Sequence, residues 1–127
     1  MIIEYAGGMK LIARHRGLET VTDQPEDGGG GNTAMTPTEL FVAALGSCAG
    51  VYVLYFAKRH DIPVEGMTIE VDYTYAEDPR RVGSMQVHVK MPQPVSEEHR
   101  AALQRSAEHC LVHNSLRQPP SVAISVS

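Results

Sequence analysis

The sequence predicts an α+β fold in which antiparallel β-strands pack with two main helices around a buried central helix. Short apolar runs rich in β-formers precede residue 23, and a long apolar run occupies the centre. Two strongly alternating runs then precede a second helical pattern. At 127 residues the chain is long enough for one domain with a real core, so we expect a single domain over residues 1–127.

The N-terminal region predicts three short strands. Ile2–Tyr5 and Lys10–His15 flank a glycine pair, which is typical of a β-hairpin, and Leu18–Thr22 adds a third strand to the meander. The next run, Asp23–Asn32 (DQPEDGGGGN), has no apolar residue and predicts a mobile linker. Its four glycines are not followed by the GK[ST] of a phosphate-binding loop.

The central helix has a well-marked start. Thr36 can serve as N-cap, Pro37 suits the first helical position, and Glu39 completes a T-x-x-E capping box. From Leu40 to Ala57 nearly every residue is apolar or small, so no single stripe can face water. We therefore expect other elements or a second subunit to wrap this helix. The run is short and interrupted by glycines, which argues against a bilayer span.

The second half predicts an antiparallel strand pair, a helix and a last strand. Met67–Tyr75 alternates, with Ile69, Val71, Tyr73 and Tyr75 on one face, and Val82–Met91 returns alongside. Ser96 caps a helix that is expected to run to about His113. The alternating segment Val122–Val126 predicts a final strand. The expected element order is therefore βββ, α, ββ, α, β.

Charge and cysteine content narrow the function classes. A formal net charge of −4 without a block of like charges argues against nucleic-acid or membrane-surface binding and favours small-molecule or protein partners. The sequence has two cysteines and no start typical of a signal peptide, which predicts a cytoplasmic location. Because Cys48 and Cys110 are far apart in sequence, neither a CxxC motif nor zinc-finger spacing is available.

Cys48 lies among small residues of the central helix and has two interpretations. It is either a small core residue or a reactive thiolate. Three turns into the helix, it is too far from the N-terminus for the helix dipole to lower its pKa, so a thiolate would need a nearby cation. Arg14 and Arg16 on the N-terminal strands are available, although each also fits an ordinary exposed strand charge.

Cys110 has the same ambiguity. It shares core spacing with Leu103 and Ala107, which fits simple packing, but crossing helices could bring it to Cys48 for a disulfide. His109 and His113 flank it at i and i+4 spacing, as metal ligands on one helix face do. No further cysteine stands near them in the sequence, so we do not expect a metal site.

The stretch TPTELFVAALGSCAG, the helix and hairpin that contain and follow it, and the second cysteine resemble the OsmC/Ohr superfamily of osmotically inducible and organic hydroperoxide resistance proteins. The resemblance implies an intertwined homodimer with active sites at the subunit interface. There a peroxidatic cysteine reduces organic hydroperoxides and a resolving cysteine forms a disulfide. Cys48 matches the peroxidatic position and Cys110 the resolving one. Arg14 best matches the arginine of the N-terminal strand, with Arg16 next.

Two departures make the chain resemble a divergent branch of that superfamily. The catalytic glutamate of the peroxidases follows the proline directly, where this chain has Thr38, and Glu39 comes one position later. The usual Cys-Pro is Cys110-Leu111 here. The expected function is a thiol-dependent peroxidase that needs no metal or organic cofactor but does need an external dithiol reductant. The alternative is a non-catalytic dimer that binds a small apolar ligand at the subunit interface.

Overall fold

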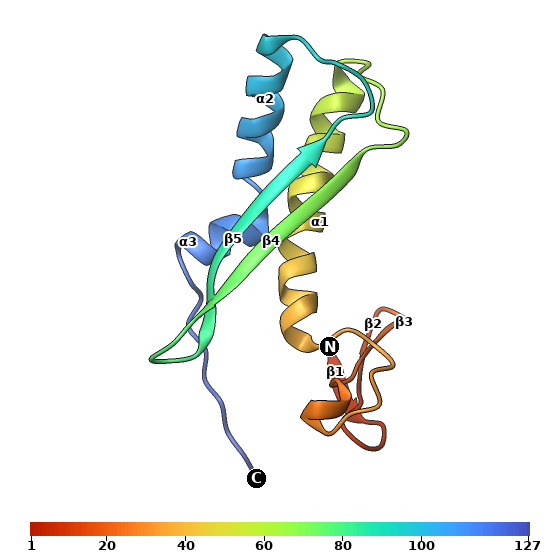
Figure 1. Cartoon of the computed structure of the whole chain (residues 1–127), viewed down its shortest axis with the longest axis vertical. Helices are drawn as coiled ribbons and strands as arrows, with labels where there is room; N and C mark the ends of the chain where they lie inside the picture. Colours follow the sequence, from red (N-terminus) through yellow and green to blue (C-terminus); the bar gives the residue numbers. More distant parts are fainter. The chain divides into compact units, whose positions relative to one another are not determined.

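Strands and helices are described for residues 1–127 in a computed structural model, shown in Figure 1, and they confirm the α+β class. The chain separates into two compact units, Met1–Phe41 and Val42–Ser127, which are described in turn. The long helix α1 begins at the end of the first unit and continues through the second.

The first unit confirms the predicted meander. β1 (Ile2–Tyr5), β2 (Leu11–His15) and β3 (Leu18–Thr22) form an antiparallel sheet in the order β1-β2-β3. In the β2–β3 turn, Arg16 and Gly17 both have positive φ values, 53° and 77°, as a tight hairpin turn requires. Several large apolar side chains of this sheet remain exposed: Ile2, Ile3, Tyr5, Leu11, Leu18 and Val21.

The prediction of a mobile linker after β3 is wrong. Asp23 is only 1% exposed, and its carboxylate accepts the N–H groups of Gln24, Gly31 and Thr33 at 2.8, 3.2 and 3.1 Å. It also accepts the Thr33 hydroxyl at 2.7 Å, and a short 3₁₀ helix, Glu26–Gly28, lies inside the loop. The Thr33 hydroxyl, followed by the backbone donors, lowers the pKa of Asp23 to about 2. One buried carboxylate therefore orders a loop that has no apolar residue.

Helix α1 (Pro37–Arg59) begins as predicted. Thr36 Oγ1 accepts the Glu39 N–H at 3.1 Å, and Glu39 Oε2 accepts the Thr36 N–H at 2.8 Å, which completes the capping box. The helix is buried along one face only. The buried residues are Val42, Leu45, Gly46, Ala49, Gly50, Val53 and Ala57.

The opposite face of α1 is exposed. Ala44, Ser47, Val51 and Tyr55 follow one another at helical spacing along this face, and Cys48 is half-buried beside them. Within one chain the central helix is therefore only partly wrapped. The helix has 23 residues and contains an 18-residue stretch with a mean hydropathy of 2.0, which is long and apolar enough to cross a membrane, so the length argument against a span is wrong. A core helix meets the same criteria, and the buried face of α1 packs on protein.

In the second unit, β4 (Thr68–Ala76) and β5 (Arg81–Lys90) form the predicted antiparallel pair. Figure 1 shows this hairpin running alongside α1 and α2. A register shift between Thr74 and Tyr75 interrupts the alternation, and Tyr75 is exposed. The expectation that Tyr75 shares the inner face with Ile69 and Val71 is therefore wrong.

The predicted helix from Ser96 to about His113 is two helices. Ser96 caps α2 (Glu97–Glu108) by accepting the His99 N–H at 3.2 Å, as predicted. The chain then turns at His109 and Cys110 and starts α3 (Leu111–Arg117). The break has a physical cause, since Cys110 adopts an extended conformation and caps the new helix with its own side chain.

The predicted last strand, Val122–Val126, does not form within the chain. Its apolar side chains are almost fully exposed, with Ile124 at 89%. A strand needs a neighbouring strand for its backbone hydrogen bonds, and β4–β5 is a two-stranded sheet with no third member. The alternating sequence pattern is therefore not enough to form a strand within this chain.

Candidate functional site

The structure brings the two cysteines together. Cys110 is 0% exposed and forms a buried cluster with Leu45 and Ala49 of α1, and Cys48 packs against the same cluster. Both are free thiols, and Cys48 is near enough to contribute to raising the pKa of Cys110. The second unit therefore brings the two cysteines into one cluster, and a disulfide between them stays a prediction.

The two thiols have different environments. Burial, the largest effect, raises the pKa of Cys110, and the hydrogen bond and charge of Cys48 raise it further. The backbone N–H groups of His113 and Val112 act in the opposite direction. Cys110 is therefore held as a protonated thiol that can donate to the Cys48 sulfur, while Cys48 is the more accessible of the two.

Local geometry explains how Cys110 reaches this position. With φ −67° and ψ 152°, it stands outside both helices as the N-cap of α3, and the His113 N–H donates to Cys110 Sγ at 3.4 Å. Sequence reasoning placed Cys110 in mid-helix and missed this cap. The segment has no glycine or proline at the break, and cysteine is not among the favoured N-cap residues, so little in the sequence signals it.

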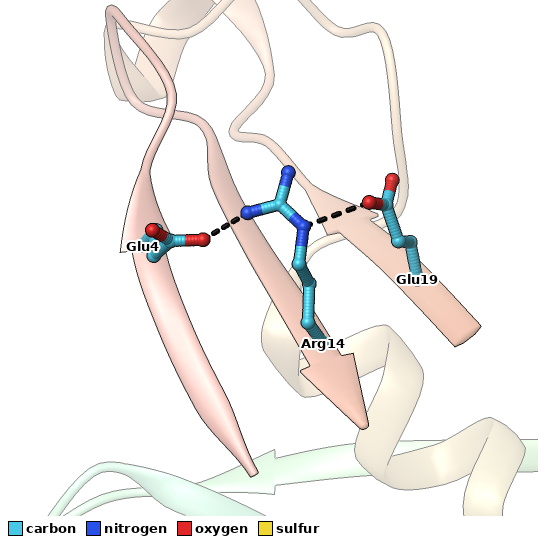
Figure 2. Close-up of polar contacts among 3 residues, drawn as sticks. All are labelled: Glu4, Arg14 and Glu19. Carbon is cyan, nitrogen blue, oxygen red and sulfur yellow. Dashed lines mark hydrogen bonds and ion pairs between the residues drawn. The ribbon is translucent and has the colours of Figure 1, made fainter. Parts of the chain in front are cut away.

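Arg14 is already paired inside the N-terminal sheet. Its guanidinium lies between Glu4 of β1 and Glu19 of β3, as Figure 2 shows, with Arg14 Nε 2.7 Å from Glu19 Oε1. The hydrogen bond and charge of Glu19, followed by the charge of Glu4, raise the pKa of Arg14 further. Arg16 lies in the β2–β3 turn. Both arginines belong to the first unit and both cysteines to the second, so a cation–thiolate contact stays a prediction.

The histidines flanking Cys110 do not share a helix. His109 ends α2, with its Nδ1 2.7 Å from the Arg105 carbonyl oxygen. His113 belongs to α3, and its Nε2 accepts the Arg117 Nε–H at 3.3 Å. The i, i+4 argument for a common ligand face is therefore wrong for this pair, and no group of three metal-ligating side chains is found in the structure.

A cavity of about 540 Å³ lies beside the thiol pair, within the second unit. It shares Leu45 and Ala49 of α1 with the cysteine cluster, and its other walls come mainly from β5 and α2. Its polar groups come from Arg100, Gln104 and Glu108 of α2, His88 of β5 and His113 of α3. The volume is in the range of small-molecule sites, about 300–1,000 Å³. Sequence reasoning did not find this cavity, because its walls come from four separate elements.

Together, the N-terminal meander, the long cysteine-bearing helix against a β-hairpin, and the second, buried thiol define an α+β thiol-pair protein. The family described as OsmC-like protein matches residues 29–125. The chain belongs to this family.

Solved structures agree with this assignment. A candidate osmotic stress induced and detoxification response protein from Psychrobacter arcticus 273-4 is 29% identical, with a TM-score of 0.84 over 90% of this chain and 85% of that one. An organic hydroperoxide resistance protein, OsmC, from Legionella pneumophila is 21% identical, with a TM-score of 0.67 over 91% and 88%. An organic hydroperoxide resistance protein from Elizabethkingia anophelis is 19% identical, with a TM-score of 0.67 over 94% and 90%. No curated protein matches the chain.

Proposed function

We propose that this chain is a thiol-dependent peroxidase that reduces organic hydroperoxides. The observation that carries the proposal is the pairing of half-buried Cys48 with buried, protonated Cys110. Membership of the OsmC-like family supports it, as do the similar structures named organic hydroperoxide resistance proteins. The reducing cytoplasm, where we expect the protein, would supply the thiols in their active form.

The chemistry runs in two steps at the cysteines. The Cys48 thiolate attacks the distal oxygen of the hydroperoxide, the O–O bond breaks, and the leaving alkoxide takes a proton to become an alcohol. Cys48 is now a sulfenic acid. The Cys110 sulfur, as it loses its proton, attacks Cys48 and expels water, which leaves a disulfide. An external dithiol then reduces the disulfide by two exchanges, and no metal or organic cofactor takes part.

The Cys110 thiol assists the first step. Because its raised pKa keeps the proton on Cys110, we propose that its S–H donates to the Cys48 sulfur. We propose Arg14 as the cation that stabilises the Cys48 thiolate and the leaving oxygen. The Glu39 carboxylate is used in the capping box. Thr38, which occupies the position of the catalytic glutamate in the peroxidases, has no carboxylate.

We also propose that the protein is a homodimer in which a second copy covers the exposed face of α1. Val51 and Tyr55 are exposed there, and Cys48 is half-buried on the same side. A second copy would remove this apolar surface from water and close the cysteine site. Sedimentation at micromolar concentration should show a dimer, and a species of only about 14 kDa would contradict it.

A second function, binding of a small apolar ligand without catalysis, is favoured by the cavity next to the thiol pair. One mass measurement separates the two functions. After a stoichiometric dose of cumene hydroperoxide, a peroxidase loses two hydrogens and both free thiols. A binding protein keeps two unmodified thiols and its original mass.

Single-cysteine variants then test the roles. Cys48→Ser should abolish hydroperoxide consumption, because no other thiol is placed to take the first oxygen. Cys110→Ser should react once and stop at the sulfenic acid, then gain a second oxygen under excess peroxide. If Cys110→Ser loses consumption and Cys48→Ser keeps it, the roles are reversed. If neither variant changes consumption, the peroxidase proposal fails.

A further inference from the structure

Cys110 has two tasks whose geometries conflict. In the reduced chain its Sγ accepts the His113 N–H at 3.4 Å and caps α3. The Val112 N–H also points to this sulfur as a donor, and it lowers the pKa of the Cys110 thiol. The same atom must also bond to Cys48 when the disulfide forms. The side chain that caps the first turn of α3 is therefore also the side chain that the reaction moves.

Disulfide formation requires a displacement larger than the cap can absorb. Two sulfurs in non-bonded contact lie at least about 3.5 Å apart, whereas an S–S bond is about 2.05 Å, so the sulfurs must close by about 1.5 Å. An N–H···S contact that starts at 3.4 Å does not survive a shift of that size away from the donor.

The movement should fall on the α3 side of the pair. Cys48 is in the middle of a 23-residue helix with seven buried residues. Helix α3 has seven residues, none of them buried, and only its Val112 packs against the cysteine cluster. The chain beyond it, residues 118–127, forms no helix or strand. The element with fewer anchors moves when the bond closes.

We propose that formation of the Cys48–Cys110 disulfide releases the first turn of α3, so that this helix is a redox-sensitive latch. In the reduced protein the latch is closed by the Cys110 cap. In the oxidised protein the loosened turn opens a path to a disulfide whose Cys110 half is fully buried in the reduced state. A dithiol reductant would then have access to this site in the oxidised protein and not in the reduced protein. This inference rests on the proposed function in one respect: the oxidant that forms the disulfide in the cell is taken to be a hydroperoxide.

Amide hydrogen exchange measured by NMR tests the latch. The full-length protein is compared reduced and after oxidation by diamide, which takes up two hydrogens as the two thiols become a disulfide and requires no peroxidase activity. We expect the Val112 and His113 amides to exchange about fivefold faster in the oxidised form, as loss of an N-cap implies. Cys48→Ser, treated with diamide in the same way, should show no change, because it cannot form the bond.

Two reduced variants provide matched controls for the cap. Serine is a good N-cap and alanine a poor one. Cys110→Ser should keep the slow exchange of the reduced parent, whereas Cys110→Ala should show the faster exchange of the oxidised parent. If Cys110→Ala does not fold, the comparison of reduced and oxidised parent still decides the question.

Two results would overturn the latch. One is equal exchange at Val112 and His113 in both states when mass analysis shows the disulfide. The other is failure of diamide to form the disulfide at all. A protein that consumes no hydroperoxide, but whose α3 loosens on diamide oxidation, would refute the proposed peroxidase and leave the latch standing.

Discussion

Replacement of Gly46 by alanine should destabilise the protein, although glycine is a poor helix former. Gly46 is on the buried face of α1, where a Cβ would lie 2.7 Å from Val71 Cγ2 of β4. Carbon atoms in normal contact lie about 3.5–4.0 Å apart, so one side must shift by about 1 Å. Val71 is stiff at χ1 and is paired in the sheet with Val87, which limits its movement.

The magnitude follows from two opposing effects. Glycine to alanine in a helix interior gains about 1 kcal/mol. Overpacking of a well-packed contact costs about 1–3 kcal/mol. We therefore expect Gly46→Ala to lower the free energy of unfolding by about 1 kcal/mol, measured by urea titration at one fixed protein concentration under reducing conditions.

Gly50→Ala is the matched control, one helical turn along the same face. Its Cβ would lie 2.3 Å from Ile69 Cδ1, the free end of a flexible side chain that can rotate away. We expect this variant to be as stable as the parent or more stable. In a Val71→Ala background, where the obstructing methyl is gone, Gly46→Ala should become stabilising. The reasoning is refuted if Gly46→Ala has the same free energy of unfolding as the parent while Gly50→Ala has a lower one. That result would mean that Val71 moves aside more easily than Ile69.

Three further predictions concern the first unit. Because Asp23 has a lower pKa in the folded chain, about 2 against 3.8, the stability it contributes is full above about pH 4 and declines as the pH falls towards 2, and Asp23→Asn should flatten this part of a urea-midpoint profile. Thr36→Ala should cost about 1 kcal/mol by the same titration, through loss of the α1 cap, and an unchanged midpoint would contradict this. Arg14→Gln should change stability by less than about 1 kcal/mol because its ion pairs are exposed. It should nevertheless slow hydroperoxide reduction by about 10²-fold, whereas Arg16→Gln should not; equal rates for all three proteins would remove Arg14 from the mechanism.

The features that local sequence patterns encode were predictable. The capping box formed by Thr36 and Glu39 needs only residues three apart, and the β4–β5 pair follows from period-two alternation. The contact between Cys48 and Cys110 could not be predicted from local patterns. The sequence showed only that the two residues would meet if their helices crossed. The resemblance to a known family supplied the pairing, and the contacts in the second unit are consistent with it.

The features that depend on a single unusual group were not predictable. A sulfur N-cap at Cys110 divides one expected helix into two, without the glycine or proline that usually marks such a break. The C-terminal segment Val122–Val126 has the pattern of a strand but no neighbour within the chain. The order of the loop after β3 depends on the burial of Asp23, a residue that is normally exposed.

By composition, the glycine-rich loop after Asp23 is where an endoprotease would be expected to cut this chain first. A protease must draw a stretch of backbone out into its cleft, and here that stretch is tied to one carboxylate. The backbone is also closely folded at Gly30, where a Cβ would lie 2.0 Å from the Gln24 carbonyl oxygen. Limited digestion at neutral pH should therefore trim the exposed residues after Arg117 and leave the glycine run intact.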